Sequence, residues 1–176
     1  TRAGIPFGHS WDSARGDTSQ TKGVRTVMFH VNEIGPTGIA IGLANGAAPL
    51  TNYIGADNNG VQYWNIGQTR KNGTWAGVQP PSFTTGDTIG MRADFNAHTV
   101  AFNKGGGAWS STIDITSLGT DVFVAVSLGS STTGQAAASI TITSDDWNDY
   151  PWTTLNIVAV GDSMTNPVPG LRTFPA

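Results

Sequence analysis

The feature that most constrains the fold is a strict alternation of apolar and polar side chains in short segments. Residues 88–95, TIGMRADF, show it most clearly, because every second side chain is apolar: Ile89, Met91, Ala93 and Phe95. A period of two with one apolar face is typical of antiparallel strands that bury one side. The same pattern recurs in six further segments: 26–31, 38–44, 60–67, 98–104, 122–129 and 138–143.

Turn-forming residues separate these segments. Asn-Gly pairs at 59–60 and 72–73 suit tight turns because both residues tolerate positive φ, and three glycines follow each other at 105–107. Helix formers are scarce, with Glu33 the one glutamate in the chain, and no segment before residue 144 has helical periodicity. We predict an all-β fold, a two-sheet antiparallel β-sandwich of about 10 to 14 strands.

Charge and composition exclude several classes of partner. The formal net charge is −3 and no basic stripe is present, so nucleic acid is not expected as a partner. No apolar run reaches the roughly 20 residues that span a bilayer. We expect no cofactor and no metal, because the acidic residues Asp145, Asp146 and Asp149 lack a full set of calcium ligands and fit a solvated turn. The uncharged Thr/Ser/Asn/Gly surface predicts an extracellular or virion-surface location.

The pattern changes at residues 144–152, SDDWNDYPW, which have the composition of a polar hinge. The segment 155–163, LNIVAVGDS, is then apolar at nearly every position, as in a strand buried on both faces of a parallel sheet. We therefore predict a boundary near residue 153, with a sandwich domain at 1–152. Residues 153–176 would be an extended C-terminal arm or the start of a second domain.

The segment 83–109 resembles the SPRY domain. The matching positions are Gly86, Asp87, Ile89, Gly90, Asp94, Val100, Phe102, Asn103 and Lys104. Upstream, GVRTVMFHV and TGIAIGLAN are similar to two further SPRY strands, and downstream VFVAVSLG is similar to a third. The resemblance spans about residues 5 to 150 in four ordered blocks. It implies a concanavalin A-like jelly-roll sandwich, the architecture that lectins share, with a recognition function carried by its loops.

Aromatic residues beside planar polar side chains are the best candidates for ligand binding. Flat rings next to such groups hold sugars by stacking and directed hydrogen bonds. The candidates are Trp64, Arg70, Asn72, Trp75 and Trp109. We expect Tyr63 or Trp64 to lie in the core, since neighbours on a strand face opposite ways. Trp75, in a predicted loop, is the preferred ligand contact, and packing is the competing interpretation for each ring.

The segment IVAVGDSMTN resembles the first block of SGNH (GDSL-type) hydrolases, in which a buried strand delivers the nucleophile. The resemblance implies that Ser163 would be a catalytic nucleophile only if a full hydrolase domain exists. No histidine or acid follows Ser163, so its partners are missing and catalysis by this chain is not expected.

Three functions are therefore open. The first is a non-catalytic recognition module that binds a surface ligand, a glycan or a surface protein, on a phage particle or bacterial surface protein. The second is the binding half of a carbohydrate esterase truncated after its nucleophile block. The third is a capsid decoration or fibre domain that forms homo-oligomers or contacts virion subunits.

Overall fold

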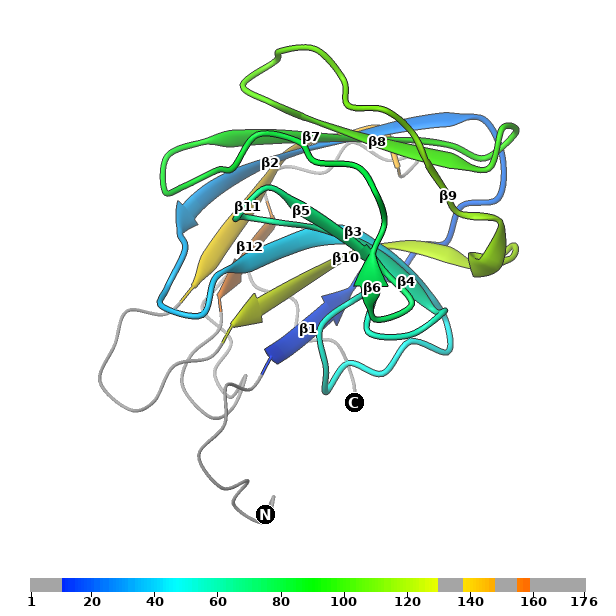
Figure 1. The fold of residues 1–176 in the computed structure, drawn as a ribbon, viewed down its shortest axis with the longest axis horizontal. Helices are drawn as coiled ribbons and strands as arrows, with labels where there is room; N and C mark the ends of the chain where they lie inside the picture. Colours follow the sequence, from blue (N-terminus) through cyan, green and yellow to red (C-terminus); the bar gives the residue numbers. More distant parts are fainter. Residues whose placement is uncertain (1–10, 130–137, 148–154, 159–176) are drawn as a thin grey trace.

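The computed structural model describes residues 11–129, 138–147 and 155–158, and these form two antiparallel sheets that face each other (Figure 1). Sheet A has the order β1-β10-β3-β4-β5-β6, and sheet B has the order β12-β11-β2-β7-β8-β9. The strands of sheet A are β1 (Trp11–Arg15), β10 (Val122–Gly129), β3 (Ile39–Asn45), β4 (Gly60–Trp64), β5 (Gln68–Lys71) and β6 (Thr74–Trp75). Those of sheet B are β12 (Leu155–Val158), β11 (Ser139–Asp145), β2 (Val24–Glu33), β7 (Thr88–Asp94), β8 (Thr99–Lys104) and β9 (Ile113–Asp114).

This architecture confirms the predicted two-sheet antiparallel β-sandwich. Within the described residues the one helical element is a single 3-10 turn, η1 (Thr116–Leu118), between β9 and β10. None of these residues forms a helix that could span a membrane.

The core lies between the inner faces of the two sheets. Sheet B contributes alternate residues of β2 and β7, and Val27, Phe29 and Met91 are completely buried. Sheet A contributes a row of directly paired residues from four strands: Val126, Ile41, Tyr63 and Thr69. The predicted inward faces of 26–31 and 88–95 are thus confirmed.

The outer face of sheet A is also covered, which the alternation does not predict. Its central residues are small, and the connection from β3 to β4 folds back over them. Ala44 and Ala125 pack there against Ala48 and Ile54 of that connection. Hydrogen bonds fix the contact, since Ser13 donates to the carbonyl of Asn52 (2.6 Å) and Ile54 donates to the Ser127 hydroxyl (2.8 Å).

Residues 68–71 and 74–75 form the strands β5 and β6, so the prediction that Trp75 lies in a loop is wrong. Strand β5 has a threonine, Thr69, at its buried position and polar residues elsewhere, so the apolar alternation that marks a strand is missing. The predicted Asn72-Gly73 turn is confirmed, because both residues have positive φ (53° and 69°) and join β5 to β6.

The predicted polar hinge is wrong for its first residues. β11 extends to Asp145, and Trp147 is buried against Phe95 with 5.4 Å between ring centroids. The Trp147 indole also donates to the Thr18 carbonyl (3.0 Å), and the Asp146 carboxylate accepts from the Thr26 backbone N–H. Burial of the large Trp147 ring therefore keeps this segment packed on the sandwich, although the residues around it are polar. Residues 148–152 lie outside the described residues.

The strand predicted after residue 153 is present as β12. It pairs antiparallel with β11, Ile157 opposite Ile140, and so forms the edge of sheet B. This agrees with an arm that docks on the sandwich, and within the described residues no parallel sheet surrounds it. Ser163 lies outside the described residues, and the division of the chain near residue 153 stays a prediction.

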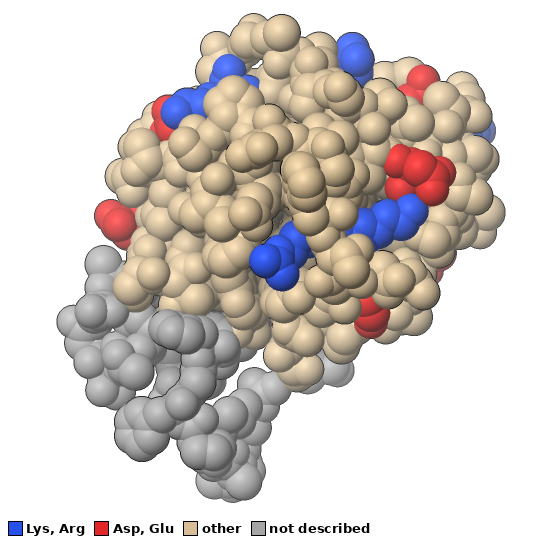
Figure 2. Space-filling view, viewed as in Figure 1, with Lys and Arg blue, Asp and Glu red and all other residues tan. Residues whose placement is uncertain are grey.

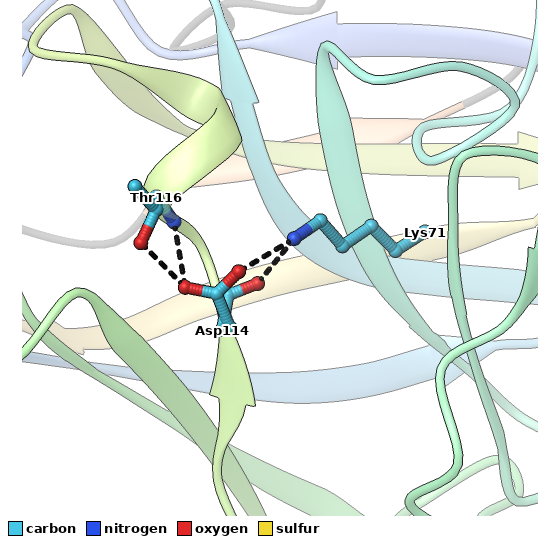
Figure 3. A network of polar contacts seen from close by, with 3 residues as sticks. All are labelled: Lys71, Asp114 and Thr116. Carbon is cyan, nitrogen blue, oxygen red and sulfur yellow. Dashed lines mark hydrogen bonds and ion pairs between the residues drawn. The ribbon is translucent and has the colours of Figure 1, made fainter.

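A polar contact joins the two sheets at one side of the sandwich (Figure 3). Lys71 of β5 approaches Asp114 of β9, with 3.0 Å between Nζ and Oδ2, and also donates to the Asp114 backbone carbonyl (2.8 Å). The other carboxylate oxygen accepts from the Thr116 hydroxyl and backbone N–H. These hydrogen bonds and the lysine charge lower the pKa of Asp114 to about 2.

Candidate recognition face

Three of the five predicted ligand contacts lie together on the outer face of sheet A. Trp64 is on β4, opposite Gln68, and Arg70 of β5 pairs directly with Trp75 of β6. Directly paired residues of antiparallel strands point to the same side of a sheet. The same register places Tyr63 on the inner face, where it is completely buried, so the expectation that one of Tyr63 and Trp64 is core is confirmed.

Two further aromatic residues complete this surface. Trp11 of β1 packs edge-on against Trp64, with ring centroids 5.8 Å apart, and against Tyr53 of the β3–β4 connection at 6.2 Å. We call Trp11, Tyr53, Trp64, Arg70 and Trp75 the aromatic face. Trp11 and Tyr53 could not be selected from the sequence, because neither lies in a segment with a clear strand pattern and their contacts are long-range.

Arg70 lies among these rings. Its guanidinium carbon is 5.5 Å from the centroid of the Trp64 ring and 6.0 Å from that of Tyr53. At these distances the ring quadrupoles attract the cation, by about 0.5–1 kcal/mol per contact at exposed sites. The rings therefore fix the position of the positive charge of Arg70 on this face.

Three polar atoms of this region are buried and have no hydrogen-bond partner within the described part of the chain. They are Gln62 Oε1, Trp64 Nε1 and Arg70 Nε. Gln62 is the direct partner of Arg70 across β4 and β5, so all three belong to neighbouring positions of one sheet face. An unpaired buried polar group costs about 1–3 kcal/mol and is rare in native proteins. Three such groups on one sheet face therefore require an explanation other than stability.

Trp75 is the most exposed member of the face. It has 60% of its surface accessible and sits on the edge strand of sheet A. An exposed tryptophan on a surface with other aromatic rings is characteristic of interaction sites rather than of folding cores. Asn72 is exposed in the adjoining β5–β6 turn, and its backbone N–H donates to the Asp57 carbonyl (3.1 Å).

Trp109 does not belong to this face, contrary to the grouping made from the sequence. It lies on the outer side of sheet B, where Arg92 stacks over its ring at 4.7 Å. The ring fills the space above Gly90, since a Cβ placed there would come within 3.1 Å of it. Trp109 and Trp64 therefore face opposite sides of the sandwich.

On the face of the molecule seen in Figure 2, charged residues are scattered among the described residues without a large region of one sign. Within the described residues no group of three or more His, Cys, Asp or Glu side chains could hold a metal ion. The arrangement offers stacking surfaces, hydrogen-bond donors and one cation, which suit binding.

Two facing antiparallel sheets define the protein as a β-sandwich domain, and one outer side of it carries the aromatic face. The SPRY domain family model matches residues 26–141, more than half of the chain. The chain belongs to the SPRY domain family. SPRY domains are protein-interaction modules, which fits a non-catalytic recognition role.

Solved structures agree with this fold. The SPRY domain of human HERC1 matches with a TM-score of 0.61 and 22% identity, over 73% of this chain and 80% of that chain. A second human SPRY domain matches with a TM-score of 0.57 and 18% identity, over 70% of this chain and 81% of that one. No curated protein matches the sequence. The family match ends before Ser163, so the resemblance to SGNH hydrolases gains no support from these comparisons.

Proposed function

We propose that this domain is a non-catalytic recognition module that binds a protein partner through the aromatic face. The observation that carries the proposal is the combination of Trp75, 60% exposed, with Arg70 beside it in direct cross-strand pairing. Tryptophan and arginine are the residues most enriched among those that dominate binding energy at protein interfaces.

The support of the face by the rest of the fold strengthens this proposal. Trp11 packs against both Trp64 and Tyr53, and the connection that carries Tyr53 is anchored to β1 and β10. Aromatic residues held in place before binding lose little conformational entropy when a partner docks.

The test is a selection from a random peptide library displayed on phage, with the domain as bait. We expect enriched peptides to bind the wild-type domain and to lose about tenfold or more in affinity to Trp75→Ala, as for an aromatic hot spot. The control is Val24→Ala, which removes an exposed apolar side chain (51% accessible) from sheet B and should leave affinity unchanged. Equal affinity of the wild type and Trp75→Ala would contradict the proposal.

A glycan is the second candidate ligand, and the exposed ring of Trp75 next to Arg70 and Asn72 favours it. The setting we propose in both cases is extracellular or on a virion, since the surface is largely uncharged. A glycan array distinguishes the two ligands. Binding of a defined glycan that Trp75→Ala abolishes would select the glycan, whereas an array without binding would leave the protein partner.

The esterase and structural alternatives make separate predictions. A hydrolase that uses Ser163 would release p-nitrophenol from p-nitrophenyl acetate and lose this activity in Ser163→Ala, and we expect no such activity from this chain. A decoration or fibre domain would form a defined oligomer, which the mass measured by light scattering would reveal.

A further inference from the structure

Two arginines in one cross-strand row of sheet A have different environments. The row runs Arg15, Ala125, Gly42, Gln62, Arg70 and Trp75 across the six strands. Arg15 donates to the carbonyls of Asn45 and Gly46 at 2.8 and 2.9 Å and stacks over Phe123. Its donors thus stabilise the β3–β4 connection.

Arg70 has neither a carbonyl nor a carboxylate partner among the described residues. Its contacts there are the rings of Trp64 and Tyr53, and its Nε is buried without an acceptor. The charged groups nearby are already engaged. Lys71 pairs with Asp114, and the Asp57 carboxylate accepts from the backbone and side chain of Asn59 at 2.9 and 3.0 Å.

A guanidinium in this environment is a receptor for a carboxylate. Its planar donors match the two oxygens of a carboxylate, and the hydrogen bonds that form are charge-assisted. The rings hold the cation in place and partly exclude water, which increases the electrostatic attraction of an anion. The neighbouring Trp64 and Trp75 then offer apolar contact to whatever flanks that anion.

We propose that Arg70 binds the carboxylate of an aspartate or glutamate in a partner protein, within a segment whose neighbouring residues are hydrophobic. The proposal rests on the proposed function and names the chemistry that this face selects. Charge complementarity supplies the acid, and the surrounding aromatic rings supply the hydrophobic flank.

The experiment uses peptides enriched from the random library on the wild-type domain, with affinities measured by calorimetry. We expect the enriched sequences to share an Asp or Glu next to an aromatic or aliphatic residue. Arg70→Gln should weaken binding by about tenfold or more, and Arg70→Lys, which keeps the charge but not the planar donors, by a smaller factor. Unfolding curves of each variant confirm that the fold is retained.

Arg92→Gln is the matched control, because Arg92 also stacks on a tryptophan but on the opposite side of the sandwich. It removes the same charge and should leave affinity unchanged. Replacing the peptide's acid by its amide should weaken binding to the wild type by the same factor as Arg70→Gln. The same replacement should have no further effect on Arg70→Gln, as expected for two groups that interact directly.

Two outcomes overturn the proposal in different ways. Enriched peptides that lack an acidic residue but still need Trp75 for binding would refute the proposed contact between Arg70 and a carboxylate. They would leave the proposed function intact. If no peptide is enriched, or if acidic glycans bind the face in place of peptides, the proposed Asp or Glu ligand of Arg70 is refuted. The protein partner of the proposed function is then refuted as well.

Discussion

Tyr63 links the core of the sandwich to the segment between β6 and β7, which contains Pro81. Its ring is completely buried against Phe83 and Phe102, with centroids 4.9 and 5.2 Å away, and its hydroxyl donates to the Pro81 carbonyl. Burial, and to a lesser extent the nearby Asp87 carboxylate, raises the pKa of Tyr63, so the hydroxyl stays neutral. The neighbouring Trp64 has the opposite role, because one step along a strand reverses the side to which a side chain points.

Replacing Tyr63 by phenylalanine tests this role. Tyr63→Phe keeps the ring but leaves the Pro81 carbonyl without its donor, which should lower the free energy of unfolding by about 1 kcal/mol. Tyr63→Ala removes the ring as well and should cost about 3–5 kcal/mol. Urea unfolding followed by tryptophan fluorescence measures both, and a Tyr63→Phe variant as stable as the wild type would show that the hydrogen bond contributes nothing.

At the scale of elements, the sequence predicts the strands that bury one apolar face and misses those that do not. β2, β7, β8 and β10 were recognised from alternation, and their inner residues are buried as expected. Alternation does not mark β5, β6 or β9. Strand β5 is polar throughout, and β6 and β9 are two-residue edge strands that gain their pairing from a neighbour rather than from an apolar pattern. Trp64, Arg70 and Trp75 could be selected from the sequence because these aromatic and planar polar residues lie close together in the chain. Trp11 and Tyr53 could not, because their contacts with this face are long-range.

The contact between β5 and β9 makes part of the stability depend on pH. The pKa of Asp114 is lowered from its ordinary value of 3.8 to about 2 in the folded protein. The contribution of Asp114 is therefore present above pH about 4 and is lost as the pH falls towards 2. Because the Asp114 side chain is 64% exposed, this contribution should not exceed about 1 kcal/mol.

Asp114→Asn should therefore be less stable than the wild type near neutral pH, and the difference should shrink as the pH falls from about 4 through 2. Lys71→Gln should lose a similar part of the stability, and the double variant should lose little more than either single change. Thermal unfolding across this pH range measures the difference. A difference between Asp114→Asn and the wild type that persists unchanged to low pH would contradict a role for the carboxylate charge.

For the whole molecule, the sandwich uses its two outer faces differently. Sheet A carries the aromatic face and the connection that supports it, whereas sheet B carries the Arg92–Trp109 pair on its own outer side. Figure 1 shows the two sheets facing each other. The fold class and the family could be predicted from alternation and from four ordered blocks of sequence. The side on which Trp109 lies could not, because it depends on how the two sheets stack and not on any local pattern.

The most direct measurement of the central claim uses the indole N–H signals of the tryptophans in a ¹H–¹⁵N NMR spectrum. Titration with a peptide enriched on the domain should shift the signals of Trp64 and Trp75, on the outer face of sheet A, in a saturable way. The signals of Trp109, on sheet B, and of the buried Trp147 should stay in place. If Trp109 shifts and Trp64 and Trp75 do not, ligands bind the opposite side of the sandwich and the aromatic face is not the recognition surface.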